Sequence, residues 1–230
     1  MRLPAGARQR GPEILARLRP SYGPPYVFLD FRTPFQLLIA VILSAQCTDE
    51  MVNRVTPDLW AHYPRPVDLA RAPRDEVERL VFRTGFYRSK AKNIQGAAAA
   101  VAERFGGEVP VSMAELLTIP GVARKTANVM QAFFGTSEGV CVDTHVGRVA
   151  RRLGLTAGDT PVKVERDLMK VYPQADWADV PFYLILHGRQ VCDARKPACH
   201  GCQLADLCPK RGVAASTMVA RVKDASWRHV

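Results

Sequence analysis

The strongest constraint on the fold lies in residues 116–153, LLTIPGVARKTANVMQAFFGTSEGVCVDTHVGRVARRL. Pro120 and Gly121 interrupt a helical segment, and a second helix is predicted from about 124 to 134. A third amphipathic helix is expected to begin directly after Asp143. The pattern therefore predicts two short helices joined by a tight turn, and then a loop and another helix. Apolar residues at helical spacing predict the buried face of the second helix: Ala123, Ala127, Met130 and Phe134.

This turn could hold a phosphate, because a helix N-terminus directs backbone N–H groups and the positive end of its dipole outward. The alternative is an ordinary interhelical turn, which a Pro-Gly pair alone favours. Lys125 falls on the face opposite the buried one. Its amine could form a Schiff base if its pKa is lowered, and the Asp143 carboxylate could stabilise positive charge or move a proton. The simpler interpretations are a solvated surface lysine and a helix N-cap.

Four of the six cysteines lie close together near the C-terminus. Four thiolates in so short a span can bind one zinc ion or hold an iron–sulfur cluster. Zinc sites more often use two short Cys-x2–4-Cys pairs, and this chain has only one. The other two cysteines, Cys47 and Cys141, are predicted to be buried as small apolar side chains. The clustered four have the spacing Cys192-x6-Cys199-x2-Cys202-x5-Cys208.

The formal net charge of +10 favours a polyanionic partner such as nucleic acid. The longest apolar stretch, residues 35–45, includes Gln36 and Ser44 and is too short to span a membrane. The basic N-terminal residues lack the apolar segment of a secretory signal, which predicts a cytoplasmic location. In that setting metal binding is a better explanation of the clustered cysteines than disulfides.

The rest of the chain shows helical patterns and no convincing strand, which predicts an all-α fold. Thr33, Pro34 and Gln36 form the pattern of a helix start. The apolar run that follows predicts a central buried helix ending in a polar turn. Further helices are expected near 12–18, 49–55, 57–62, 73–83 and 89–105.

Two motifs within residues 116–153 resemble a known family. IPGVARKTANVM followed by VCVDTHVGRV resembles the helix-hairpin-helix DNA glycosylases, and within them the endonuclease III family. The resemblance extends in the same order over about residues 12–210. It implies a two-lobed all-α fold, with a six-helix barrel domain that holds the helix-hairpin-helix at 27–137 and an iron–sulfur cluster domain at 1–26 and 138–212. Residues 213–230 are expected to be a C-terminal extension that is longer than in many family members, and Trp227 is expected to pack it down.

The resemblance assigns roles around the hairpin. Lys125 stands at the position of the lysine that attacks the sugar C1′, and Asp143 at that of the assisting aspartate. The family pattern is usually Pro-Gly-Val-Gly, and this chain departs from it at the second glycine. If that position needs a positive φ, alanine there would be strained. Four residues of these motifs are expected to contact DNA: Gly121, Ala123, Arg124 and His145.

Two loops also resemble the family. ILSAQCTD matches a signature whose glutamine enters the gap left by a flipped nucleotide, a role that falls to Gln46; without the resemblance a turn glutamine is preferred. GFYRSKAKNI matches a loop whose leucine wedges against the opposite strand. Phe86 stands at that position, and its alternative is packing on the core. Ser44 and Asp49 are expected to line the base pocket.

The x6-x2-x5 cysteine spacing is that of the family's [4Fe–4S] cluster. The resemblance therefore implies this cofactor, with the four clustered cysteines as its ligands. Arg195 and Lys196 lie between the first two ligands. They are expected to face DNA phosphate, although a solvated charge pair would be the default without the family.

The implied function is base excision repair. The enzyme would be a bifunctional DNA glycosylase and abasic-site lyase that removes oxidised pyrimidines, such as thymine glycol, through a lysine Schiff base and β-elimination. Its partner would be double-stranded DNA with damaged bases or abasic sites, with no membrane and a monomeric chain. Three alternatives are an adenine glycosylase, which typically lacks the lysine, a non-catalytic DNA-binding module, and an iron–sulfur electron carrier, which would need no hairpin.

Overall fold

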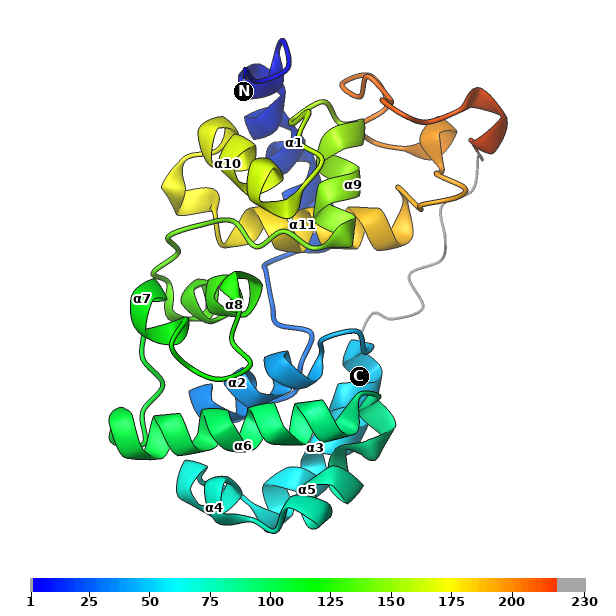
Figure 1. Ribbon diagram of the computed structural model, residues 1–230. Helices are drawn as coiled ribbons and strands as arrows, with labels where there is room; N and C mark the ends of the chain where they lie inside the picture. The colour runs from blue at the N-terminus through cyan, green and yellow to red at the C-terminus, as the bar shows by residue number, and fades with distance from the viewer. Residues whose placement is uncertain (1, 219–230) are drawn as a thin grey trace. The chain divides into compact units, whose positions relative to one another are not determined.

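The structure is a computed structural model that describes residues 2–218. Trp227 and most of the predicted C-terminal extension lie outside the described residues. The described part of the chain is helical and contains no strand, which confirms the all-α prediction (Figure 1). No helix in that part is both long and apolar enough to cross a membrane. The chain divides into two compact units, called here the hairpin unit, Val27–Thr136, and the cysteine unit, Met1–Tyr26 with Ser137–Val230.

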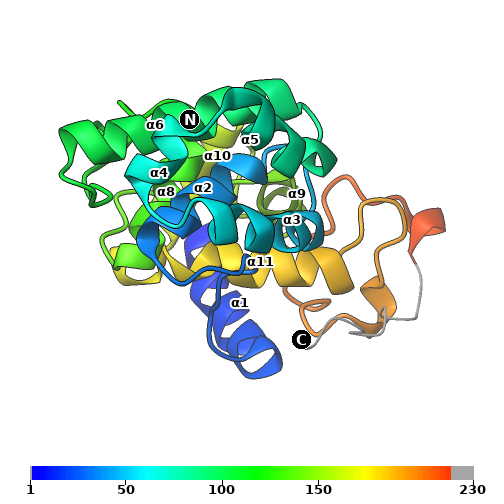
Figure 2. The same ribbon diagram turned by 90° about the horizontal axis from the view of Figure 1, so that it is seen from below.

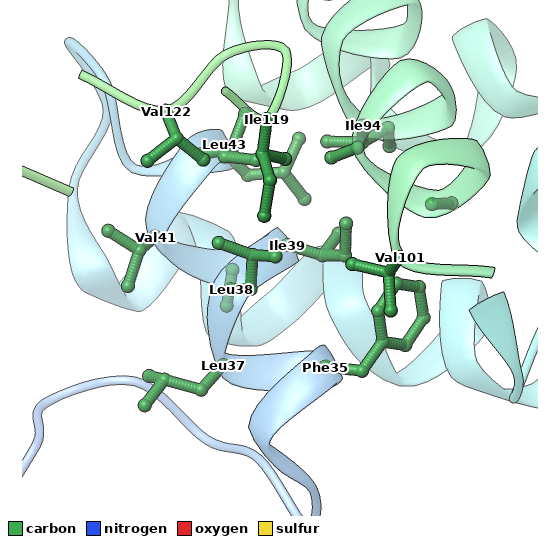
Figure 3. Close-up of a cluster of buried hydrophobic side chains, with 14 of the residues drawn as sticks. Phe35, Leu37, Leu38, Ile39, Val41, Leu43, Ile94, Val101, Ile119 and Val122 are labelled. Carbon is green, nitrogen blue, oxygen red and sulfur yellow. The ribbon is translucent and has the colours of Figure 1, made fainter. Parts of the chain in front are cut away.

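The hairpin unit is built around one buried helix, α2. Thr33 caps it, because its hydroxyl oxygen accepts a hydrogen bond from the Gln36 amide at 3.2 Å. Every α2 residue after Pro34 is buried, as the apolar run predicts. Side chains of α2 meet those of α6 and of the turn before α8 (Figure 3). The helices of this unit are α2 (Pro34–Leu43), α3 (Asp49–His62), α4 (Pro66–Arg71), α5 (Arg74–Val81), η1 (Phe82–Thr84), α6 (Tyr87–Arg104), α7 (Met113–Leu116) and α8 (Arg124–Phe134).

The cysteine unit packs three helices on or beside α11. Both views show α1 and α9 close to α11 (Figures 1 and 2), and α10 contacts α1 and α9. The loops that carry the four cysteines follow α11. The helices of this unit are α1 (Ala7–Tyr22), α9 (Thr144–Arg152), α10 (Pro161–Val171), η2 (Gln174–Asp176), α11 (Asp179–Gln190), η3 (Cys199–Gly201) and η4 (Ala215–Thr217).

Some predicted helix boundaries are wrong, because packing overrides proline. The helix expected at 12–18 is α1, which begins at Ala7 and contains Pro12 and Pro20. The segments expected at 49–55 and 57–62 form one helix, α3, which continues through Pro57. In each case buried apolar residues on both sides of the proline offset the missing N–H. Helices α4, α10 and α11 were not predicted.

Candidate functional site

The turn before α8 requires glycine at Gly121 for two reasons. Its φ is +78°, a backbone conformation that favours glycine. A Cβ there would also lie 2.9 Å from the Asn93 Cβ of α6 and 3.2 Å from the Ile42 Cγ2 of α2. The turn is closed by a hydrogen bond from the Val122 amide to the Ile119 carbonyl at 3.1 Å. It is thus held tightly against two helices.

Ala123 differs from both expectations for it. It is exposed rather than part of the buried face, because it is the N-cap residue and lies outside the helical phase of α8. Its φ is −100° and its ψ is 172°, an extended backbone that any residue adopts, so alanine here carries no strain. The hairpin therefore does not need a second glycine. As the N-cap, alanine also provides no side-chain acceptor for the first N–H groups of α8.

Lys125 is the second residue of α8 and is exposed, as the helical phase predicts. Arg124 beside it is exposed as well, whereas Ala127 and Met130 are buried. The first turn of α8 therefore presents two cationic side chains, together with the positive end of the helix dipole. This arrangement attracts an anion and places an amine beside it.

Two other predicted DNA contacts lie near this turn. Gln46 follows α2 by three residues, and Phe86 is the N-cap of α6; both are exposed. Because Gly121 contacts the last turn of α2 and the second turn of α6, the three segments gather at one end of the unit. Gln46 and Phe86 have φ angles of 53° and 49°. Such left-handed backbone costs roughly 1 kcal/mol or more per non-glycine residue and concentrates at functional sites.

The two residues expected to line the base pocket also lie at this end. The hydroxyl of half-buried Ser44 donates to the Val41 carbonyl at 2.8 Å. Asp49 is the first residue of α3 and is half-buried. Cys47 between them is half-buried rather than buried as predicted, because it follows the end of α2 and packs only partly against the core. Cys141 in the other unit is buried, as predicted.

Asp143 belongs to the cysteine unit, where it caps α9. Its Oδ1 accepts a hydrogen bond from the Val146 amide at 2.7 Å. Its Oδ2 lies 3.4 Å from Nδ1 of His145, and the two side chains are 18% and 30% exposed respectively. The simpler interpretation of Asp143 as an N-cap is therefore correct. The cap places the Asp143 carboxylate at the start of α9, and a capping carboxylate can still act on a proton or a positive charge.

The four clustered cysteines line one common pocket. Among the described residues, no three His, Cys, Asp or Glu side chains lie close enough together to hold a single metal ion. The four thiols therefore line a cavity and do not meet at one metal-ion position. Burial, with a smaller effect of the neighbouring thiols, raises the pKa of Cys202 to about 11. Such thiols need a bound cationic group to become thiolates. Their number and placement fit an iron–sulfur cluster.

Two arginines of α9 hold the start of the cysteine loop, and the sequence analysis missed both. Arg148 donates to the carbonyls of Gly188 and Cys192, at 2.9 and 3.2 Å. Arg152 donates to the Asp193 carbonyl at 2.6 Å and lies 3.4 Å from the Cys192 sulfur. Their spacing of four residues puts them on one face of α9. That spacing was the available signal, but it equally describes a solvated basic helix.

A third missed residue is His187 of α11, which is buried beside the pocket. Its Nε2 lies 3.6 Å from the Cys202 sulfur, and its Nδ1 lies 3.4 Å from the Tyr22 hydroxyl. Burial lowers the pKa of His187 to about 4, so the ring is neutral at pH 7. A neutral imidazole can donate one hydrogen bond toward a thiolate, which is one way proteins tune an iron–sulfur cluster.

Asp193 shapes the loop that presents the predicted phosphate contacts. Its Oδ1 accepts from the backbone amides of Arg195 and Lys196 at 2.9 and 3.0 Å. Both cationic side chains are exposed. The loop therefore turns back on itself and displays two positive charges next to the cysteine pocket.

Comparison with known proteins gives two family matches. Residues 39–174 match the HhH-GPD superfamily, described as base excision DNA repair proteins. Residues 192–208, from the first clustered cysteine to the last, match the iron–sulfur binding domain of endonuclease III. The two matches fall on the hairpin and on the cysteine loop.

Individual relatives agree with these matches. The chain is 56% identical over 210 residues to endonuclease III of Synechocystis sp., covering 91% of this chain and 96% of the relative. A trapped covalent endonuclease III–DNA intermediate is 40% identical, with a TM-score of 0.82 over 88% of this chain and 96% of that one. A non-covalent endonuclease III–DNA complex is also 40% identical, with a TM-score of 0.83 over 88% and 95%.

Proposed function

From the premise that this chain belongs to the HhH-GPD superfamily of base excision DNA repair proteins, and within it to the endonuclease III family, we propose that it acts on oxidised pyrimidines. It is a DNA glycosylase and abasic-site lyase that carries a [4Fe–4S] cluster. The proposed lesions are ring-saturated bases such as thymine glycol in duplex DNA. The proposed chemistry is base removal followed by strand cleavage through a lysine Schiff base.

Lys125 supports this chemistry most directly, because it is an exposed amine one residue into a helix that follows a tight turn. The neutral amine attacks C1′ of the flipped nucleotide, and the base leaves with the bonding electrons and takes up a proton. The sugar ring opens to an iminium, loss of a C2′ proton follows, and the 3′ phosphate departs. Hydrolysis of the imine then returns the amine. A covalent endonuclease III–DNA intermediate in a similar structure supports this sequence.

Asp143 assists through its carboxylate group. The ionised carboxylate stabilises positive charge as the glycosidic bond breaks, and it can also receive or return a proton. Its N-cap hydrogen bond fixes the orientation of the carboxylate before substrate binds.

Two substitutions at Asp143 should separate catalysis from capping. Asp143→Asn keeps an amide oxygen that can accept from Val146, so we expect slow base removal with little change in the free energy of unfolding. Asp143→Ala should lose both the catalytic carboxylate and the N-cap hydrogen bond, and its free energy of unfolding should be lower by about 1 kcal/mol. Single-turnover rates and urea unfolding measure the two effects. Equal destabilisation by both variants would show that the charge, rather than the cap, stabilises the fold.

The remaining motifs contact DNA in this proposal. Amides at the start of α8, with Gly121, Ala123 and Arg124 around them, hold a backbone phosphate. Gln46 enters the gap left by the flipped nucleotide, and Phe86 wedges against the opposite strand. Ser44 and Asp49 line the base pocket. His145 contacts the DNA backbone near Asp143.

Cys192, Cys199, Cys202 and Cys208 are the proposed ligands of the cluster. The bound cluster supplies iron–thiolate bonds that tie the loop together. Arg148 and Arg152 hold the surrounding backbone, and Arg152 and His187 contact the sulfurs of Cys192 and Cys202. The loop thereby keeps Arg195 and Lys196 in place for DNA phosphate.

Replacing Arg195 and Lys196 together by alanine should weaken binding to all duplexes. Each lost phosphate contact should reduce the slope of log K against log salt by about 0.9, so two contacts give about 1.8. Fluorescence anisotropy between low and moderate salt measures the slope. A matched variant replaces Arg65 and Arg71, which lie at the two ends of α4 and are not among the proposed contacts. An unchanged slope in the loop variant would show that the loop does not touch phosphate.

Borohydride trapping tests the proposed chemistry. The wild-type protein should form a permanent crosslink with duplexes that contain thymine glycol or an abasic site, and none with undamaged duplex. Base release without crosslinking or strand cleavage would favour the adenine glycosylase type. Binding alone would favour the non-catalytic module. The monomeric state and cytoplasmic location stay predictions.

A further inference from the structure

The loop that carries Phe86 presents a second exposed aromatic ring. Phe82 of η1 is 60% exposed and Phe86 is 68% exposed. Among the large hydrophobic side chains of the described residues, these two have the highest exposed fractions. Single exposed apolar side chains are common, but two large exposed rings four residues apart in one loop suggest a binding role. Phe82 plays no part in the function proposed so far.

Phe82 is supported from one side. Its ring centroid lies 5.0 Å from that of Tyr87, with the ring planes tilted by 55°. Tyr87 is half-buried and packs against the core of the hairpin unit. The guanidinium of Arg88 lies 5.2 Å from the Tyr87 centroid. Phe82 therefore rests on a packed ring while most of its own surface faces solvent.

The loop beneath the two rings is fixed by hydrogen bonds. The Thr84 hydroxyl donates to the Val81 carbonyl at 2.8 Å. The Lys90 ammonium, only 4% exposed, donates to the Thr84 carbonyl at 2.6 Å. Gly85 has a φ of +69°, and a Cβ there would meet nothing within 4 Å, so the turn projects into open space. The rings thus stand on a braced, protruding turn.

The charges around the rings favour nucleic acid over an apolar protein surface. Arg83 and Arg88 are exposed on either side of the turn. Glu78, the only carboxylate paired with either of them within the described residues, is 3.9 Å from Arg88. Aromatic rings flanked by cations suit a strand that offers base faces and phosphates together.

We propose that Phe82 and Phe86 form a two-ring aromatic edge, in which Phe82 stacks on an unpaired base of the strand opposite the lesion. Once the damaged nucleotide leaves the duplex, its former partner loses its pairing and exposes a face. Gln46 fills the gap, Phe86 wedges against the opposite strand, and Phe82 stacks on the exposed face of the unpaired base. This inference deepens the proposed function, since that function supplies the flipped nucleotide.

Binding to a duplex with a tetrahydrofuran abasic analogue opposite 2-aminopurine tests the edge. Stacking on Phe82 should quench 2-aminopurine fluorescence when wild-type protein binds. Phe82→Ala should remove the quench and weaken binding about tenfold, within the range of one base–aromatic stack. Phe82→Trp should restore both, whereas Phe82→Leu, which is apolar but lacks a ring face, should not. None of these variants should change the salt slope, since no charge is lost.

Val111→Ala is the matched control, because Val111 is 40% exposed in the same unit and lies outside the loop. It should leave affinity and fluorescence unchanged. Undamaged duplex is the second control, and Phe82→Ala should bind it as the wild-type protein does. An equal loss on damaged and undamaged duplexes, or restoration by Phe82→Leu, would overturn the stacking proposal. So would unchanged quenching by Phe82→Ala.

This experiment needs no catalysis, so it can fail independently of the proposed function. If the wild-type protein crosslinks and cleaves DNA but Phe82→Ala changes neither fluorescence nor affinity, the aromatic edge is wrong and the glycosylase chemistry stands. If the wild-type protein never crosslinks but the fluorescence result holds, the edge stands in a protein that binds unpaired sites. Thermal unfolding of Phe82→Ala checks that the loop remains folded.

Discussion

Lys125→Gln should abolish borohydride crosslinking and reduce strand cleavage by roughly 10³-fold or more, the scale expected when a covalent nucleophile is removed. Glutamine keeps most of the side-chain length but has no amine that can form an imine. Binding to a duplex with an abasic analogue should persist, since the proposed phosphate contact uses backbone amides of α8 rather than the Lys125 side chain. Gel analysis after borohydride, with anisotropy on the same duplex, measures both effects.

Arg124→Gln is the matched control for this prediction. It removes one exposed cation from the same turn of α8 and leaves the amine in place. It should weaken binding in a salt-dependent way and still crosslink. Crosslinking by Lys125→Gln would assign the reaction to another amine. Loss of crosslinking in both variants, with equal loss of affinity, would make Lys125 a binding residue.

Loss of one clustered cysteine should have the second large effect. Cys202→Ala should remove the cluster, lowering iron from about four per chain to nearly none and bleaching the yellow-brown colour. Because metal–ligand binding energy is also folding energy, the loop at 192–208 should lose protection from proteolysis. Affinity for DNA should fall with it, since Arg195 and Lys196 lose their fixed positions. Iron analysis, absorbance and limited proteolysis follow these changes.

Cys47→Ala provides the control, because Cys47 is a half-buried thiol of the other unit and packs on its core. It should keep its iron and its colour. Wild-type protein that is colourless and carries one zinc ion would contradict the cluster. Iron retained in full by Cys202→Ala would remove that residue from the ligand set.

The sequence predicted best where local rules decide the structure. The cap at Thr33, the apolar run of α2 and the glycine after α8 each determine an element through neighbouring residues, and these elements are as predicted. The prediction was wrong where contacts between residues far apart in the sequence decide the structure. Pro57 does not end α3, because side chains beyond it are buried by other helices.

In the candidate site too, the features set by local sequence were predicted and those set by the fold were not. The cysteine spacing and the turn at Gly121 are visible in the sequence, and comparison with known families supports their interpretation. The roles of Arg148, Arg152 and His187 could not be predicted, because each contacts backbone or sulfur that the fold alone brings near. Ala123 was misjudged, since only the structure shows that its backbone is extended.

In the proposed function, the positive φ angles of Gln46 and Phe86 would also affect how fast DNA can be searched. Each left-handed residue costs free energy, and here folding has already met that cost by packing the ends of α2 and α6. An encounter with a base pair would therefore begin with both exposed residues already in their left-handed backbone conformation, so that neither turn has to be ordered first. A repair protein meets many intact base pairs for every lesion. Dwell time on each is then limited by the stability of the DNA rather than by rearrangement of the protein.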